Sequence, residues 1–155
     1  MPQPESLARY PMERLDSTIR EWFLVAQDEA NRRGSRYLTT GLILIAAGTS
    51  KTVFAERLLA ALRLRTGVQL VEAFDAEWES SRPFLHDEPV TAVKESILKS
   101  AGEEESDQLV SPQAFVATML DFPSGMASKI LKRLGVDPSD AAHRLRSGIA
   151  REPSP

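Results

Sequence analysis

The chain has 155 residues, of which 42% are hydrophobic and 26% are charged, which is enough for one globular domain with its own core. It contains no cysteine, which excludes disulfides, thiolate nucleophiles and thiolate metal sites and favours a reducing, cytoplasmic location. Its net charge is −3, and the basic residues are scattered along the chain, so we do not expect a nucleic acid as partner.

The two ends of the sequence are polar or proline-bearing. Residues 1–10 contain two prolines and no apolar run, which indicates a flexible N-terminal segment and neither a secretory signal nor a membrane anchor. The longest apolar stretch, residues 41–48, is far shorter than the roughly 20 residues of a membrane helix. We therefore expect no contact with a membrane, one domain over residues 11–148, and a flexible tail over residues 149–155.

Helix signals follow one another at regular intervals in the first part of this domain. The predicted helices span about 11–33, 41–47, 51–64 and 68–78, and a proline-bearing connector follows over 79–89. Gly34 is a candidate C-cap of the first helix. Thr39 is a candidate N-cap of the second, which is apolar nearly all round and should be buried, and Gly48 is expected to end it.

The same order of elements returns in the second part of the domain. The predicted helices span about 90–101, Pro112 to Met119, 126–134 and Asp137 to Gly148. Ser111 followed by Pro112 is typical of a helix start, because the hydroxyl caps the helix and proline fits its first position. Gly135 after Lys132 and Arg133 is typical of a helix end. The acidic residues 103–105 are interpreted as a solvated loop.

One constant shift along the sequence, without a gap, superimposes the central parts of the two series of helices. We call it the repeat shift. It places Thr39 on Ser111, so both short helices begin at a hydroxyl. Two amphipathic helices can always be slid into some agreement, but agreement across two helices and the turn between them favours a true repeat. The pairs that keep hydrophobic class are Tyr37 and Leu109, Ile43 and Phe115, Leu44 and Val116, Ala55 and Ala127, Leu58 and Ile130, Leu59 and Leu131, and Leu62 and Leu134.

The two copies are expected to differ after Leu62. There, residues 63–66 are interpreted as an insertion before Gly67-Val68, the expected counterpart of Gly135-Val136.

The repeated pattern resembles the amino-terminal domain of Clp-type AAA+ chaperones, a double Clp repeat that precedes their ATPase modules. The family motif has the form Ile-x-Thr-Glu-His-Leu-Leu-Leu, then a helix ending Ala-x-x-Leu-Leu-x-x-Leu, then Gly-Val-Asp. The similar stretches here are residues 37–44 and 109–116 for the first part, and 55–62 and 127–137 for the second. The resemblance covers residues 15–146, nearly the whole chain.

The resemblance implies an all-α fold, a compact bundle of about eight helices formed by two pseudo-symmetric four-helix repeats at about 11–80 and 89–148. It implies a non-catalytic module that binds substrate proteins, peptides or adaptor proteins, with a Clp ATPase or protease as a further partner. Some members bind phosphorylated arginine with the Thr-Glu pair of each repeat. The acidic position is Thr40 in one copy here and Pro112 in the other, so the resemblance does not extend to phosphoarginine recognition.

The candidate ligand-binding residues lie where the two short helices begin. They are Thr39, Thr40, Ser111 and Gln113, because the backbone N–H groups at a helix start can bind an anion by donating hydrogen bonds to it. Two aromatic residues in proline-bearing loops, Phe84 and Phe122, are candidate apolar anchors for a partner. Trp22, Phe23 and Trp78 lie at helical spacing and are interpreted as core residues instead.

Two other functions are weighed against this prediction. A scaffold that has lost peptide binding would keep the same fold. A degenerate nucleotide-binding enzyme would use residues 42–52 as a strand and phosphate loop, but the glycines that such a loop needs are replaced by Ile45 and Ser50 beside Lys51. Neither of the two histidines, His86 and His143, has an acidic or histidine partner at ligand spacing, so we expect no metal and no cofactor.

Overall fold

The described part of the chain is a bundle of helices. A computed structural model describes residues 15–34, 39–81, 110–122 and 125–150. The helices in these ranges are α1 (Ser17–Arg33), α2 (Thr40–Thr49), α3 (Val53–Leu62), α4 (Val68–Ser81), α6 (Pro112–Leu120), α7 (Met126–Arg133) and α8 (Pro138–Ala150). Within these ranges no strand forms apart from an isolated parallel bridge between Leu15 and Val110. The predicted all-α class is confirmed, and the helix predicted at 90–101 lies outside the described residues.

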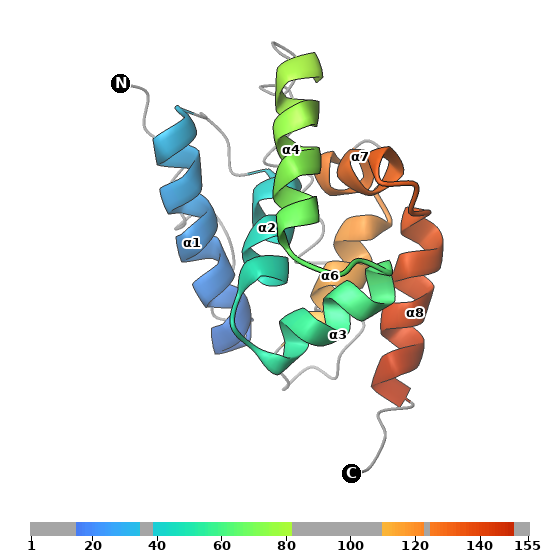
Figure 1. Ribbon diagram of the computed structural model, residues 1–155. Coiled ribbons are helices and arrows are strands. Elements are labelled where there is room, and N and C mark those ends of the chain that lie inside the picture. Colours follow the sequence, from blue (N-terminus) through green and yellow to red (C-terminus); the bar gives the residue numbers. More distant parts are fainter. Residues whose placement is uncertain (1–14, 35–38, 82–109, 123–124, 151–155) are drawn as a thin grey trace.

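Helix α2 lies at the centre of the bundle. It contacts α1, α3, α4 and α7, and Figure 1 shows it between α1 and α4. Every residue from Thr40 to Gly48 is buried, as the apolar pattern predicts for a helix without a polar face. Each buried leucine or isoleucine in it contributes about 2 kcal/mol to the hydrophobic stabilisation of the fold.

Two glycines let the neighbours of α2 approach closely. A Cβ atom at Gly41 would collide with the side chain of Met126 on α7, and one at Gly48 would collide with Leu70 on α4. A Cβ at Gly67, at the start of α4, would lie 2.7 Å from the carbonyl oxygen of Gly48. Gly48 is therefore a packing residue inside α2, and the expectation that it ends this helix is wrong. The helix continues to Thr49, and Ser50 is its C-cap.

Other helix ends differ from prediction because polar side chains set them locally. Helix α1 begins at Ser17, later than the predicted start, since Asp16 is its N-cap and accepts a hydrogen bond from the Thr18 N–H at 2.7 Å. Helix α3 begins at Val53, after the N-cap Thr52. Helix α4 runs into the predicted connector as far as Ser81.

The last helix also differs from prediction, because α8 continues past Gly148 to Ala150 and takes the first two residues of the predicted tail.

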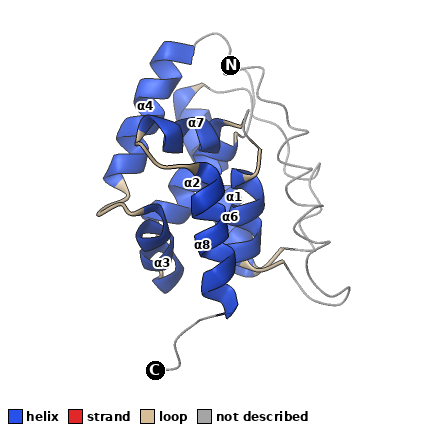
Figure 2. Ribbon diagram, turned by 90° about the vertical axis from the view of Figure 1, so that its right-hand side faces the viewer, coloured by secondary structure: helices blue, strands red, loops and turns tan. Residues whose placement is uncertain are grey.

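Within the described ranges, the helices after α1 form two trios, one before and one after residues 82–109. The first trio is α2, α3 and α4, and the second trio is α6, α7 and α8. The trios pack crosswise: α4 contacts α7, and α8 contacts α3. An ion pair joins Arg133 of α7 to Glu77 of α4 at 3.1 Å. Figures 1 and 2 show α3 beside α8 and α7 beside α4.

The core joins α1 to both trios. The ring of Trp22 on α1 lies 5.2 Å from that of Phe54 on α3 and 6.4 Å from that of Phe115 on α6, measured between ring centroids. Trp22, Phe23 and Trp78 are buried, which confirms that they are core residues. Among the described helices, none has the length and apolar composition to cross a membrane.

Candidate functional site

The two short helices begin with the same hydrogen bonds, at positions related by the repeat shift. The hydroxyl of Thr39 accepts from the Leu42 N–H at 3.2 Å, and that of Ser111 accepts from the Ala114 N–H at 3.2 Å. Both residues are extended and precede the first helical residue, as the sequence predicts for N-caps. The predicted starts of these helices are therefore confirmed.

The predicted ligand residues differ in how accessible they are. Thr39 is 1% exposed and Thr40 is 0% exposed, whereas Ser111 and Gln113 are half-buried. The Thr40 hydroxyl accepts a hydrogen bond from the Ala127 N–H, at 3.1 Å, at the start of α7. This contact supplies a cap that α7 otherwise lacks, because its own N-cap, Gly125, has no side chain. The hydroxyls of Thr39 and Thr40 thus have structural roles, and the start of α6 is the more open of the two helix ends.

The C-terminal ends of α3 and α7 repeat each other as closely as the N-caps do. Arg63 and Gly135 both adopt the left-handed conformation, with φ of 60° and 76°. The Leu64 N–H donates to the Leu59 carbonyl at 2.9 Å, and the Val136 N–H donates to the Leu131 carbonyl at 2.8 Å. These are two Schellman motifs, and the same repeat shift relates them.

This geometry corrects the alignment expected from the sequence. Arg63-Leu64, not Gly67-Val68, is the structural counterpart of Gly135-Val136. The expected insertion therefore begins after Leu64. The sequence obscures this equivalence because Arg63 occupies a conformation in which glycine is the usual residue.

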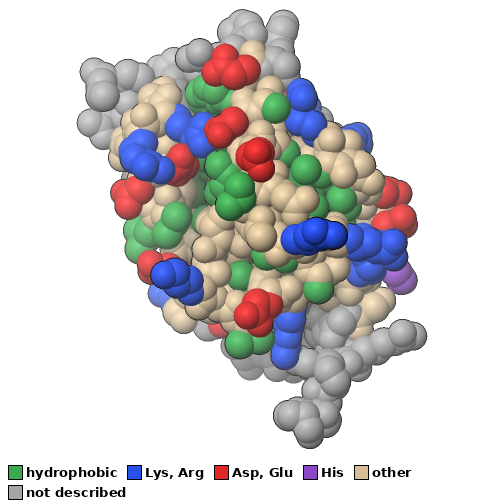
Figure 3. Space-filling view, in the orientation of Figure 1, with side chains coloured by type: hydrophobic (Ala, Val, Ile, Leu, Met, Phe, Trp, Pro, Cys, Tyr) green, Lys and Arg blue, Asp and Glu red, His purple; other side chains and the backbone are tan. Residues whose placement is uncertain are grey.

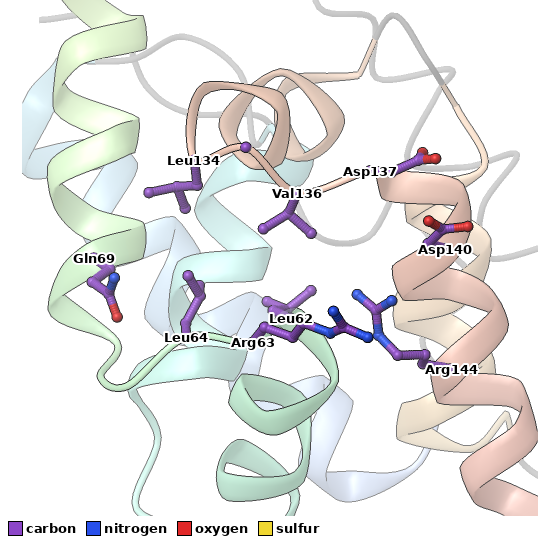
Figure 4. Close-up of a pocket in the computed structure, with 10 residues that line it drawn as sticks. Leu62, Arg63, Leu64, Gln69, Leu134, Val136, Asp137, Asp140 and Arg144 are labelled. Atoms are coloured by element: carbon purple, nitrogen blue, oxygen red, sulfur yellow. The ribbon is translucent and has the colours of Figure 1, made fainter.

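A pocket of about 360 Å³ lies between these two helix ends, as Figure 4 shows. Three pairs of residues related by the repeat shift line it, and they are Leu62 with Leu134, Arg63 with Gly135, and Leu64 with Val136. Gln69 of α4, Asp137 before α8, and Asp140 and Arg144 of α8 complete its wall. We call this the junction pocket. Sequence reasoning missed it, because Arg63 does not mark the end of α3 as Gly135 marks the end of α7.

A second pocket, of about 300 Å³, lies between α1, α2 and α4. Its rim carries Glu29, which accepts hydrogen bonds from both Arg32 and Arg33. Partial burial raises the pKa of the Glu29 carboxyl, but these hydrogen bonds and the charges of the two arginines lower it, and the net pKa lies below its ordinary value of 4.5. Arg33 also pairs with Asp75 of α4 at 2.7 Å. The charges on this rim are largely neutralised by one another.

The phosphate-loop interpretation of residues 42–52 is wrong. These residues form most of α2 and the bend that leads to α3, so no strand precedes Lys51. Across the described ranges, no three histidine, aspartate or glutamate side chains gather closely enough to hold a metal ion. On the face in Figure 3, hydrophobic side chains lie between acidic and basic ones and form no continuous apolar patch.

Of the two predicted apolar anchors, only Phe122 lies within the described residues. It follows α6 and is half-buried, and its carbonyl oxygen accepts hydrogen bonds from the Gly125 N–H at 3.0 Å and the Ser128 hydroxyl at 2.8 Å. Its backbone is thus fixed while part of the residue stays accessible. Phe84 lies outside the described residues.

No protein-family model and no curated protein sequence matches this chain.

Proposed function

We propose that the chain is a non-catalytic protein- or peptide-binding module built from two Clp-like repeats. The observation that carries the proposal is the repetition, at one constant shift along the sequence, of both the N-cap and the Schellman hydrogen bonds. Unrelated helices often have N-caps and Schellman motifs of these kinds, but they would not be expected to place both at one constant shift. The crosswise contacts of α4 with α7 and of α8 with α3 fit two copies related by a pseudo-twofold axis.

The resemblance to the amino-terminal domain of Clp-type chaperones supplies the kind of ligand. Substrate proteins, peptides and adaptor proteins are the proposed partners, and a Clp ATPase or protease is the proposed complex to which they would be delivered. The absence of cysteine from the whole chain fits a reducing, cytoplasmic setting. The accessible surfaces that support binding are the start of α6, the half-buried Phe122 and the junction pocket.

The start of α6 carries the anion-binding part of the proposal. Ser111 and Gln113 are half-buried there. Pro112 has no N–H, and the N–H groups of Ala114 and Phe115 donate to the hydroxyl and the carbonyl of Ser111, so the Gln113 N–H is the proposed donor to an anion. Titration with free phosphoarginine tests this end. Binding that Ser111→Ala weakens would support it, and Thr52→Ala is the matched control because it removes the same kind of N-cap from α3. Equal effects of both variants would show a loss of stability and not of binding.

The burial of Thr39 and Thr40 favours a second candidate function, a scaffold that no longer binds ligands at α2. Both hydroxyls accept hydrogen bonds within the bundle. In that case phosphoarginine leaves the amide chemical shifts of both residues unchanged. Saturable shifts at Thr39 and Thr40 would contradict the scaffold interpretation.

The whole proposal is tested by peptide capture on the immobilised full chain. The probe is a random dodecapeptide library, half with free carboxyl ends and half amidated, and mass spectrometry identifies what is retained. We expect the chain to retain a subset of peptides that an unrelated helical protein does not retain. Retention of no peptide from either half would overturn the peptide-binding function and leave the scaffold function.

A further inference from the structure

The junction pocket combines an apolar floor with opposite charges at its edges. The side chains of Leu62, Leu64, Leu134 and Val136 form the floor, and Arg63 and Arg144 stand at one edge. Asp137 and Asp140 stand beside α8 at another edge. A ligand that fits this layout has an apolar body, an anionic group at one end and donor groups next to it.

The backbone of Arg63 gives a reason to look for a role of its side chain. A left-handed conformation is unfavourable for a non-glycine residue because its Cβ atom crowds the backbone, and Gly135 avoids this cost at the equivalent place. Strain of this kind persists where the surrounding structure or a function requires the side chain. Here it directs an exposed guanidinium across the pocket.

The second guanidinium is fixed by the same helix end. Nε of Arg144 donates to the carbonyl oxygen of Ala61, at 2.6 Å, in the last turn of α3. The terminal nitrogens of Arg144 then point toward the side chain of Arg63, as Figure 4 shows. Within the described part of the chain, neither arginine forms an ion pair with a carboxylate. Two guanidinium groups held in this way are a receptor for an oxyanion, because each presents paired N–H donors.

The two aspartates distinguish between oxyanions. The carboxylate of Asp137 accepts from the Ser139 N–H at 3.0 Å as the cap of α8, which holds it beside the pocket. Four charges, two of each sign, thus line one pocket. A dianionic phosphate would meet repulsion from the aspartates, whereas a peptide end has one carboxylate and amide donors close behind it.

The geometry points to the junction pocket as a receptor for the carboxyl-terminal residue of a peptide, with an apolar last side chain on the leucine and valine floor. The terminal carboxylate binds Arg63 and Arg144, and the preceding amide N–H groups face Asp137 and Asp140. This inference rests on the proposed peptide-binding function and names its ligand class.

The test uses the full chain and a fluorescein-labelled peptide, Gly-Ser-Gly-Ala-Ala-Leu, with a free or an amidated carboxyl end. Fluorescence anisotropy gives the dissociation constant of each form. Loss of the terminal charge should weaken binding by about ten-fold or more. The key variant is Arg63→Gly, which keeps the fold because glycine suits the left-handed conformation. The matched control is Arg20→Ala, which removes an exposed arginine from α1, away from the pocket.

We expect Arg63→Gly to weaken binding of the free-carboxyl peptide about ten-fold. The same variant should lose most of the preference for the free-carboxyl peptide over the amidated one. Arg20→Ala should have neither effect. Equal binding of the free and amidated peptides by the wild type would overturn the inference while leaving peptide binding intact. Displacement by inorganic phosphate together with indifference to amidation would show a phosphate site and overturn it too. If the domain binds no peptide in the capture experiment either, the proposed function itself fails.

Discussion

Replacing Thr40 by valine tests the contact that joins the two trios at α7. The substitution keeps the shape of a residue that is 0% exposed and removes the oxygen that accepts from the Ala127 N–H at 3.1 Å. A buried donor without a partner costs about 1 to 3 kcal/mol, and loss of a helix cap costs about 0.5 to 2 kcal/mol. We therefore expect Thr40→Val to lower the free energy of unfolding by about 1 to 2 kcal/mol, or about 3 to 6 °C in Tm.

Thr118→Val is the matched control for this measurement. Thr118 is also 0% exposed, but its hydroxyl donates to the Ala114 carbonyl within its own helix, at 2.8 Å. The carbonyl can keep its backbone partner, so the control should lose well under half as much stability. Urea unfolding followed by circular dichroism gives both values, and hydrogen exchange should show faster exchange at Ala127. Equal losses in the two variants would refute a capping role for Thr40.

Three further predictions concern the helix ends and the ion pairs. Arg63→Gly should raise the free energy of unfolding by about 1 kcal/mol, and Gly135→Ala should lower it by a similar amount, since both residues are left-handed. Urea titration measures both changes. Destabilisation by Arg63→Gly would contradict the strain assigned to Arg63. The lowered pKa of Glu29 means that its charge stabilises the fold above pH 4.5 and loses this effect as the pH falls through the folded-state pKa, so the stability difference between wild type and Glu29→Gln should shrink from pH 6 to pH 3. Asp121→Asn should lower the free energy of unfolding by about 1 kcal/mol, because the carboxylate pairs with both terminal nitrogens of half-buried Arg146, at 2.8 and 3.4 Å. Thermal unfolding at low and high salt measures this loss. A loss of stability that is the same at both salt concentrations would exclude the ion pair as its cause.

The features that the sequence predicts well are those made within a few residues of chain. The N-caps Thr39 and Ser111 and the C-cap Gly34 each satisfy backbone groups three or four residues away, and residue type alone signals them. The uniform apolar pattern of α2 likewise predicts its burial. The all-α class follows from these local signals.

The features that the sequence does not reveal depend on partners far along the chain. Thr40 bonds a residue 87 positions away, and nothing in its local sequence separates this role from ligand binding. Gly48 looks like a helix end until Leu70 is found against it. The helix end at Arg63 escapes sequence prediction for another reason. Its backbone hydrogen bonds match those at Gly135, but arginine is not a residue type that signals a left-handed helix end. The junction pocket depends both on contacts between residues far apart in the chain and on the left-handed Arg63.

The crosswise packing of the trios also determines how the chain can unfold. Because α4 covers α7 and α8 covers α3, each trio separated from the other would expose a helix face that its own sequence cannot cover. The central helix α2 would lose α7 as well, and it has no polar side to turn to water. The two trios should therefore unfold in one transition, with hydrogen exchange slowest in α2. Fragments that carry one trio each should therefore be less stable apart than when they are mixed, because mixing restores the contacts of α4 with α7 and of α8 with α3.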